Sequence, residues 1–215
     1  MTDAPHTGLP PGTLRLTAAQ RGVWFAQRLD PADPSYNIAE YADIRGRIEP
    51  DLLRRAVSHT ADEMEALRST FGEHDGVPFQ RVRSVREGGA VPVPLVDLSH
   101  TEDPHAEALR RMKRCLAEPA DLSAGPLVRI TLYRLSASHH LFHQQVHHLA
   151  LDGYAAVLAL SRIAEVYTAL ALDPDAGAGP RPGGARAAHQ EEGGAEPATQ
   201  QGGRAHRVGG AHHRG

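Results

Sequence analysis

Five histidines fall within ten residues of this chain, and the last two are adjacent. They are His139, His140, His143, His147 and His148. An imidazole has a pKa of about 6.5, so it can exchange a proton at neutral pH, and its neutral form binds zinc. In "VHHLALDGYA" the adjacent pair precedes an Asp-Gly dipeptide. These residue types are compatible with proton transfer, with a metal site, or with ordinary polar residues at a strand end.

The metal interpretation rests on His139, His143 and His147, which repeat every four residues. That spacing aligns three ligands only on a helix. The intervening "LFHQQV" instead predicts a strand, on which the three side chains lie too far apart to bind one ion. No carboxylate or cysteine follows at ligand spacing. We therefore expect no metal site.

The surroundings of His147 and His148 favour a chemical role over packing alone. The expected order is a strand, the two histidines, three apolar residues, Asp-Gly and a long helix. A histidine at the end of a strand projects into any cleft that lies there. Asp152, just before a helix, can cap its first N–H groups or hold an arginine. Gly153 is expected to let the backbone turn where a side chain would clash.

Periodicity and turn residues predict the elements that position this segment. Thr17 and Gln20 form a capping box that starts a helix, and "DPADP" ends it. The apolar face of this helix is expected to contain Val23, Trp24 and Leu29. The Asp-Gly pair at 75–76 marks a hairpin turn. Further strands are predicted over 35–46, 91–99, 126–135 and 140–148, and further helices begin near 49, 102 and 154.

The last helix, 154–172, is apolar on several sides. Its buried face can be lined by Val157, Leu160, Ile163, Ala164, Tyr167 and Leu170. Helices and strands mix along the chain without strict βαβ alternation. This order favours an α+β fold, which we expect to be a two-layer sandwich.

Composition narrows the functional classes. The 215 residues carry a formal net charge of -3, so nothing favours nucleic acid as a partner. No apolar run approaches the roughly 18 residues that cross a bilayer, so no membrane partner is expected. The single cysteine, Cys115, excludes an internal disulfide and fits a cytoplasmic protein. We expect residues 1–13 to be a disordered leader and the glycine-rich 173–215 a disordered low-complexity tail.

The segment His147–Gly153 carries a family resemblance. It resembles the HHxxxDG signature of condensation domains of non-ribosomal peptide synthetases, which are built like chloramphenicol acetyltransferase. Three further stretches are similar to segments of these domains, in the same order: "LTAAQRGVWFAQRLDPADPSYNIAEY", "EALRSTF" and "PADLSAGPLVRITLYRL". The resemblance covers residues 14–172. The first stretch looks most like aryl-accepting siderophore synthetases, such as bacillibactin or enterobactin synthetases.

The resemblance implies a role for each residue of the motif. His148 would face a tunnel and assist the attack of a carrier-bound amine on a carrier-bound thioester, and Gly153 would offer its N–H to the developing oxyanion. Asp152 would pair with Arg68 and fix the histidine loop, and His147 would support the site by packing. The domain would bind no cofactor covalently. Aryl, acyl or peptidyl carrier proteins would present phosphopantetheine arms.

The chain departs from the family pattern after the first lobe. Where relatives continue into a second, C-terminal lobe and downstream synthetase domains, this sequence becomes rich in Gly, Ala, Arg and His. We therefore expect a truncated fragment that has negligible condensation activity alone. Two alternatives remain open at this stage: a non-catalytic remnant that docks carrier proteins, and a stand-alone acetyltransferase-like enzyme completed by trimerisation.

Overall fold

A four-stranded mixed sheet forms the centre of the protein. The computed structural model describes residues 8–87 and 90–173. The sheet has the order β2-β7-β6-β5, with β2 (Asn37–Arg45), β7 (His139–His147), β6 (Val128–Ser136) and β5 (Leu95–Asp97). β7 is antiparallel to both of its neighbours, β2 and β6, and the short edge strand β5 runs parallel to β6. The edge position of β5 agrees with the prolines that precede it.

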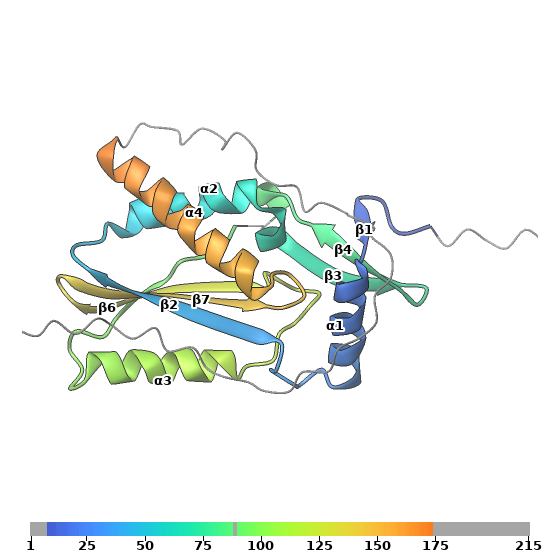
Figure 1. The fold of residues 1–215 in the computed structure, drawn as a ribbon, viewed down its shortest axis with the longest axis horizontal. Helices are drawn as coiled ribbons and strands as arrows, with labels where there is room; N and C mark the ends of the chain where they lie inside the picture. The colour runs from blue at the N-terminus through green and yellow to red at the C-terminus, as the bar shows by residue number, and fades with distance from the viewer. Residues whose placement is uncertain (1–7, 88–89, 174–215) are drawn as a thin grey trace, which may run out of the picture. The chain divides into compact units, whose positions relative to one another are not determined.

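Helices cover both faces of this sheet (Figure 1). The helices α2 (Pro50–Glu63) and α4 (Gly153–Leu172) pack on one face around Val57, Phe142 and Ile163. The helix α3 (Pro104–Leu116) packs on the other face through Ala108 and Met112. The α+β class is therefore confirmed, but the expected two-layer arrangement is wrong. Residues 140–147 of β7 are all buried, so the central strand needs cover on both faces.

A second, smaller sheet supports the helix α1 (Ala18–Leu29). It has the order β1-β4-β3, with β1 (Thr13–Arg15), β4 (Val77–Val82) and β3 (Ser69–His74). The predicted hairpin turn is confirmed, because Asp75 and Gly76 both have a positive φ (49° and 77°). Two short 3-10 helices, Glu65–Arg68 and Val85–Glu87, flank the hairpin. The strand β1 begins at Thr13, the last residue of the expected leader.

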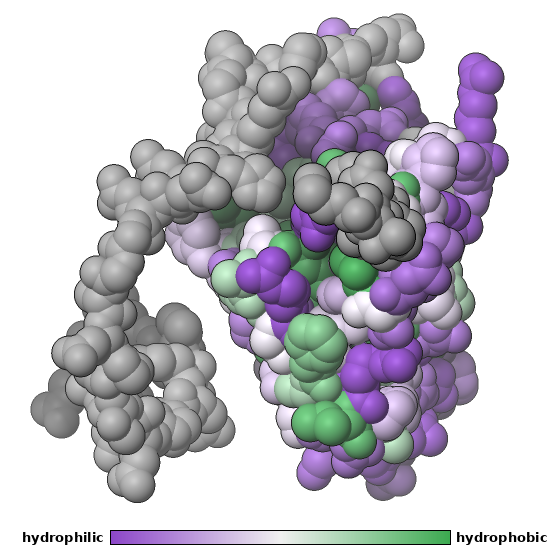
Figure 2. Space-filling view, turned by 90° about the vertical axis from the view of Figure 1, so that its right-hand side faces the viewer, coloured by the Kyte–Doolittle hydropathy of each residue, from purple (hydrophilic) through white to green (hydrophobic). Residues whose placement is uncertain are grey.

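The helix α1 starts as predicted but buries a narrower face than expected. Both hydrogen bonds of the Thr17–Gln20 capping box are present. Trp24 is buried with Phe71 and Leu149, whereas Leu29 is 89% exposed. Phe25 is also 53% exposed, and Figure 2 shows apolar surface among hydrophilic surface at this end of the molecule.

The helix α4 is long and apolar enough to cross a membrane by length and composition, which the sequence reading did not foresee. Its packing against α2 and the sheet accounts for part of this apolar character, since Ala159, Ile163 and Val166 are buried there. The expected face is rotated, however, because Val157 is 48% exposed. The expected tail falls outside the described residues, apart from the C-cap Asp173, and so does the leader up to residue 7.

Candidate active site

The loop between β7 and α4 buries every second residue. His147, Leu149 and Leu151 are at most 4% exposed, whereas His148 and Asp152 are exposed. Leu149 packs with Trp24 of α1, and Leu151 packs beneath α4. Gln20 of α1 also donates a hydrogen bond from Nε2 to the Leu149 carbonyl (3.2 Å). The two buried leucines anchor the loop in two parts of the core, and His148, which precedes them, is exposed.

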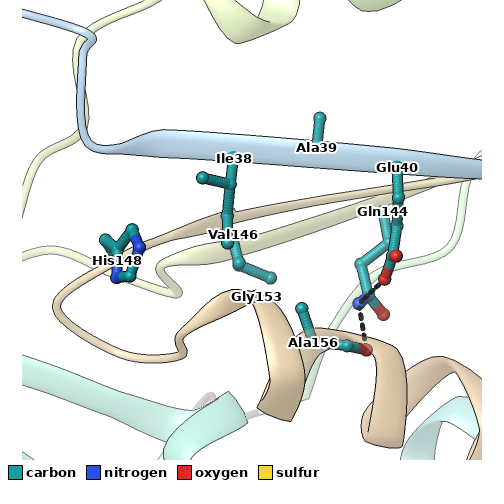
Figure 3. Close-up of a pocket in the computed structure, with 8 residues that line it drawn as sticks. All are labelled: Ile38, Ala39, Glu40, Gln144, Val146, His148, Gly153 and Ala156. Atoms are coloured by element: carbon teal, nitrogen blue, oxygen red, sulfur yellow. Dashed lines mark hydrogen bonds between the residues drawn. The ribbon is translucent and has the colours of Figure 1, made fainter. Parts of the chain in front are cut away.

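His148 lies at the lip of a cavity of about 210 Å³ between β2, β7 and the start of α4. Its backbone N–H donates to the carbonyl of Tyr36 (2.8 Å), which fixes the loop to the start of β2. Figure 3 shows the imidazole at one end of the cavity, beside Ile38 and Val146. The ring is exposed, so it can meet a ligand that enters the cavity. His148 is therefore an exposed histidine beside a cavity.

His147 points in the opposite direction, into the interior. Its Nδ1 accepts a hydrogen bond from the Leu149 N–H (3.2 Å), so the ring proton lies on Nε2 and is donated to Gln27 Oε1 (3.0 Å). Burial, followed by the neighbouring His148, lowers the pKa of His147 to about 4. Gln27 in turn donates to the carbonyls of Asp30 and Asp33. His147 is therefore a neutral residue that links the loop to α1.

The expected ion pair between Asp152 and Arg68 is wrong. No ion pair joins them in the part of the chain that the structure describes. The Arg68 guanidinium instead donates to the carbonyls of Ala61 (2.7 Å) and Arg83. Asp152 is exposed, and its Oδ1 accepts from the Ala155 N–H (2.8 Å), as an N-cap of α4 does. The carboxylate therefore fixes the helix start, and the guanidinium fixes the segment that leads to the hairpin.

Gly153 is the first residue of α4 and lines the same cavity as His148. The expected role in avoiding a clash is wrong for this structure, because a Cβ at this position would meet nothing within 4 Å and its φ is not positive. Within the described residues no acceptor is recorded for its N–H, as is usual in the first turn of a helix. This free donor and the open space above it suit the approach of a ligand from outside.

The far end of the cavity holds two polar residues that sequence reasoning missed. Glu40 and Gln144 face each other across β2 and β7, and Gln144 Nε2 donates to Glu40 Oε1 (3.2 Å) and to the Ala156 carbonyl (2.9 Å). Burial raises the pKa of Glu40. The only available signal was a polar residue between two apolar ones on the same face: Glu40 between Ile38 and Ala42, and Gln144 between Phe142 and Val146. Gln27, the partner of His147, was missed because a glutamine on a helix is ordinarily exposed.

The remaining candidate residues are the histidines considered as metal ligands and Cys115. No group of three metal-binding side chains is found among residues 8–87 and 90–173. His139, His143 and His147 lie on the strand β7, as predicted. Cys115 is partly buried at a second cavity of about 350 Å³, which His147 and Gln145 also line.

Comparison with known proteins identifies the family. A model of the condensation domain family matches residues 11–180. The chain belongs to this family. The starter condensation domain of rhizomide synthetase has a similar fold, with a TM-score of 0.70 and 36% identity over 74% of this chain. The match confirms the resemblance of the HHxxxDG segment and the α+β, chloramphenicol acetyltransferase-like fold expected from it.

Relatives of known function are large synthetases. The dimodular nonribosomal peptide synthase of Bacillus subtilis is 39% identical over 72% of this chain, and the isonitrile lipopeptide synthase of Streptomyces coeruleorubidus is 37% identical over 79%. Enterobactin synthase component F of Escherichia coli O157:H7 is 31% identical over 73%. The chain spans 6–12% of the length of these three relatives and 38% of the solved starter condensation domain.

Proposed function

We propose that the chain contributes the histidine-bearing part of a site that forms amide bonds between carrier-bound substrates. The observation that carries this proposal is the exposed His148 imidazole at the lip of a cavity that the free Gly153 N–H also lines. The His148 imidazole can accept a proton, and the Gly153 N–H can stabilise an oxyanion. The acyl transfer of a condensation domain needs both, within reach of one carbonyl carbon.

In the proposed reaction the amine of an acceptor attacks the thioester carbonyl of a donor. A C–N bond forms, the C–S bond breaks, and the amine proton passes to the leaving thiolate. His148 accepts or holds that proton, and the Gly153 N–H donates to the carbonyl oxygen while it carries negative charge. His147 and Asp152 touch neither substrate in this scheme. They hold the loop and the start of α4 in place.

The partners follow from this chemistry. Aryl, acyl or peptidyl carrier proteins present the two substrates on phosphopantetheine arms, and no cofactor is held covalently by the chain itself. The similarity to enterobactin synthase component F supports a place in siderophore synthesis. We assign the reaction to the cytoplasm, because a chain with a single cysteine is suited to a reducing compartment.

A reconstitution assay tests the proposal. The full chain is mixed with an acyl-loaded and an aminoacyl-loaded carrier protein, with and without the remaining part of a relative's condensation domain as a separate polypeptide. Product is measured by mass spectrometry of the free thiol on the donor carrier and of the amide that remains on the acceptor carrier. We expect product in the complemented mixture and negligible product with the chain alone, because positioning needs both walls of the tunnel.

The variant His148→Ala should lower the rate of product formation by about 100-fold or more, the range of general base catalysis. His105→Ala, an exposed histidine on α3, is the matched control and should leave the rate unchanged. Carrier binding without product in the complemented mixture would favour the docking remnant over the enzyme. Product that His148→Ala does not reduce would contradict the role proposed for His148.

A further inference from the structure

Two polar side chains interrupt apolar rows at the cavity's inner end. On β2, Glu40 lies between Ile38 and Ala42 in the row that faces α4. On β7, Gln144 lies between Phe142 and Val146 in the matching row. The strand register pairs Glu40 directly with Gln144. Burying a carboxylate and an amide in such rows costs free energy unless they have hydrogen-bond partners.

The pair leaves hydrogen-bond capacity unused on the acceptor side. Gln144 is 1% exposed, its Nε2 already donates to Glu40 and Ala156, and its enclosed Oε1 has no hydrogen-bond partner among the described residues. Both residues line the cavity at the end away from His148, where Glu40 presents a half-buried carboxylate. A ligand group that hydrogen-bonds to this carboxylate must donate, because a carboxylate only accepts.

We propose that Glu40 and Gln144 select an acyl donor that carries a hydroxyl group at the end remote from its thioester. This proposal rests on the proposed function, since it assumes that the thioester carbonyl lies beside His148. The walls between the two ends are apolar, formed by Ile38, Val146 and Ala156, and they suit a flat ring or a short chain.

The position of the two polar residues limits where the hydroxyl can be. Glu40 and Gln144 lie at the end of the cavity that is remote from His148. A donor whose thioester lies beside His148 therefore reaches them only with a group that points away from the thioester. A para-hydroxyl on a benzoyl ring points in this direction. An ortho-hydroxyl lies beside the carbonyl and does not reach Glu40.

A binding experiment with the full chain tests the selection. The probes are N-acetylcysteamine thioesters of benzoic, 2-hydroxybenzoic and 4-hydroxybenzoic acid, and dissociation constants are measured by NMR titration. We expect the 4-hydroxybenzoyl thioester to bind about tenfold more tightly than the other two, which corresponds to about 1.4 kcal/mol. The variant Glu40→Leu, which completes the apolar row, should bring that ratio to one or below, and Glu40→Gln should give an intermediate ratio.

Two controls separate this proposal from the proposed function. Glu73→Gln removes an exposed carboxylate from β3 and should leave the ratio unchanged. His148→Ala should also keep the ratio while abolishing any condensation, so loss of one property does not report on the other. Equal binding of the three probes, a preference for the ortho-hydroxyl, no binding of any probe, or a tenfold ratio that a folded Glu40→Leu variant retains would overturn the selection.

Discussion

His147 and His148 are adjacent imidazoles with different surroundings and therefore different chemistry. His147 is enclosed between α1 and the loop, where both ring nitrogens already have partners. His148 is exposed beside the cavity and the free N–H of Gly153. Proton transfer needs a ring nitrogen that a substrate can reach, so only His148 meets the condition. His147 and Leu149, the buried residues on either side of His148, impose this alternation.

Substitution of Asp152 distinguishes an N-cap from a buried ion pair. Asp152→Asn keeps a side-chain oxygen for the Ala155 N–H, so we expect it to lower the free energy of unfolding by less than about 0.5 kcal/mol, and Asp152→Ala by about 1 kcal/mol. Breaking a buried ion pair would instead cost about 3–5 kcal/mol. Urea unfolding at pH 7 measures both values.

A double-mutant cycle with Arg68 completes this test. Arg68→Ala alone should destabilise the fold by about 2 kcal/mol, because the carbonyls of Ala61 and Arg83 lose a charged donor. The coupling free energy between Arg68→Ala and Asp152→Asn should be below about 0.5 kcal/mol, as for independent sites. A coupling free energy of several kcal/mol would indicate that Arg68 and Asp152 form an ion pair after all.

Among the secondary-structure elements, the helix α4 connects the candidate site to the core. Asp152 caps its first turn, Gly153 begins it at the cavity, and its buried residues pack on the sheet. The buried positions are Ala156, Ala159, Ile163, Val166 and Leu170. This spacing is helical, but it lies one position from part of the face expected from the sequence. The helix is apolar on several sides, so only contact with α2 and β7 decides which side is buried.

Alanine substitutions along α4 test the orientation of the helix. Ile163→Ala should lower the free energy of unfolding by about 3 kcal/mol, because the side chain is 2% exposed and leaves a cavity. Val157→Ala should cost less than about 1 kcal/mol, since Val157 is half exposed and alanine favours the helix. Urea unfolding measured at one temperature compares the two variants. Similar losses of stability at both positions would indicate that α4 buries the face expected from the sequence, which includes Val157.

The stability of the whole molecule depends on pH through two buried histidines of the central strand β7, His143 and His147. His143 of β7 is 1% exposed, and neither ring nitrogen has a hydrogen-bond partner among the described residues. Burial lowers its pKa to about 4, and that of His147 also to about 4. The unfolded chain binds protons at these rings near pH 6.5, whereas the folded protein does not. Stability present above pH 6.5 is therefore lost as the pH falls from 6.5 towards 4.

The stability of the whole fold should consequently fall between pH 7 and pH 5. Each of the two histidines contributes roughly 2 kcal/mol to this loss, at about 1.4 kcal/mol per pH unit below 6.5. His143→Leu removes an unpartnered polar ring, so it should retain or increase stability at pH 7 and reduce the loss by about half. Urea unfolding at pH 7, 6 and 5 checks both statements, with the exposed His105→Leu as control. An unchanged pH dependence in His143→Leu would contradict the assignment.

Local sequence was sufficient for features whose partners lie within a few residues. The capping box at Thr17, the hairpin turn at Gly76 and the burial of Trp24 follow from short spacings and were confirmed. The HHxxxDG segment indicated the family together with three further stretches in the same order, and it placed the histidines at a strand end. Its alternation of buried and exposed residues places His148 outward only because Leu149 and Leu151 have cores to enter.

Tertiary structure decided everything that depends on contacts between distant segments. The pairing of Glu40 with Gln144 joins strands 104 residues apart, and the partner of His147 lies 120 residues away in α1. Arg68 found backbone carbonyls instead of Asp152. These outcomes depend on strand register and helix rotation, which are set by the packing of the whole fold. Residue types and their spacing cannot specify them, because the same polar side chain can satisfy several partners at similar free energy.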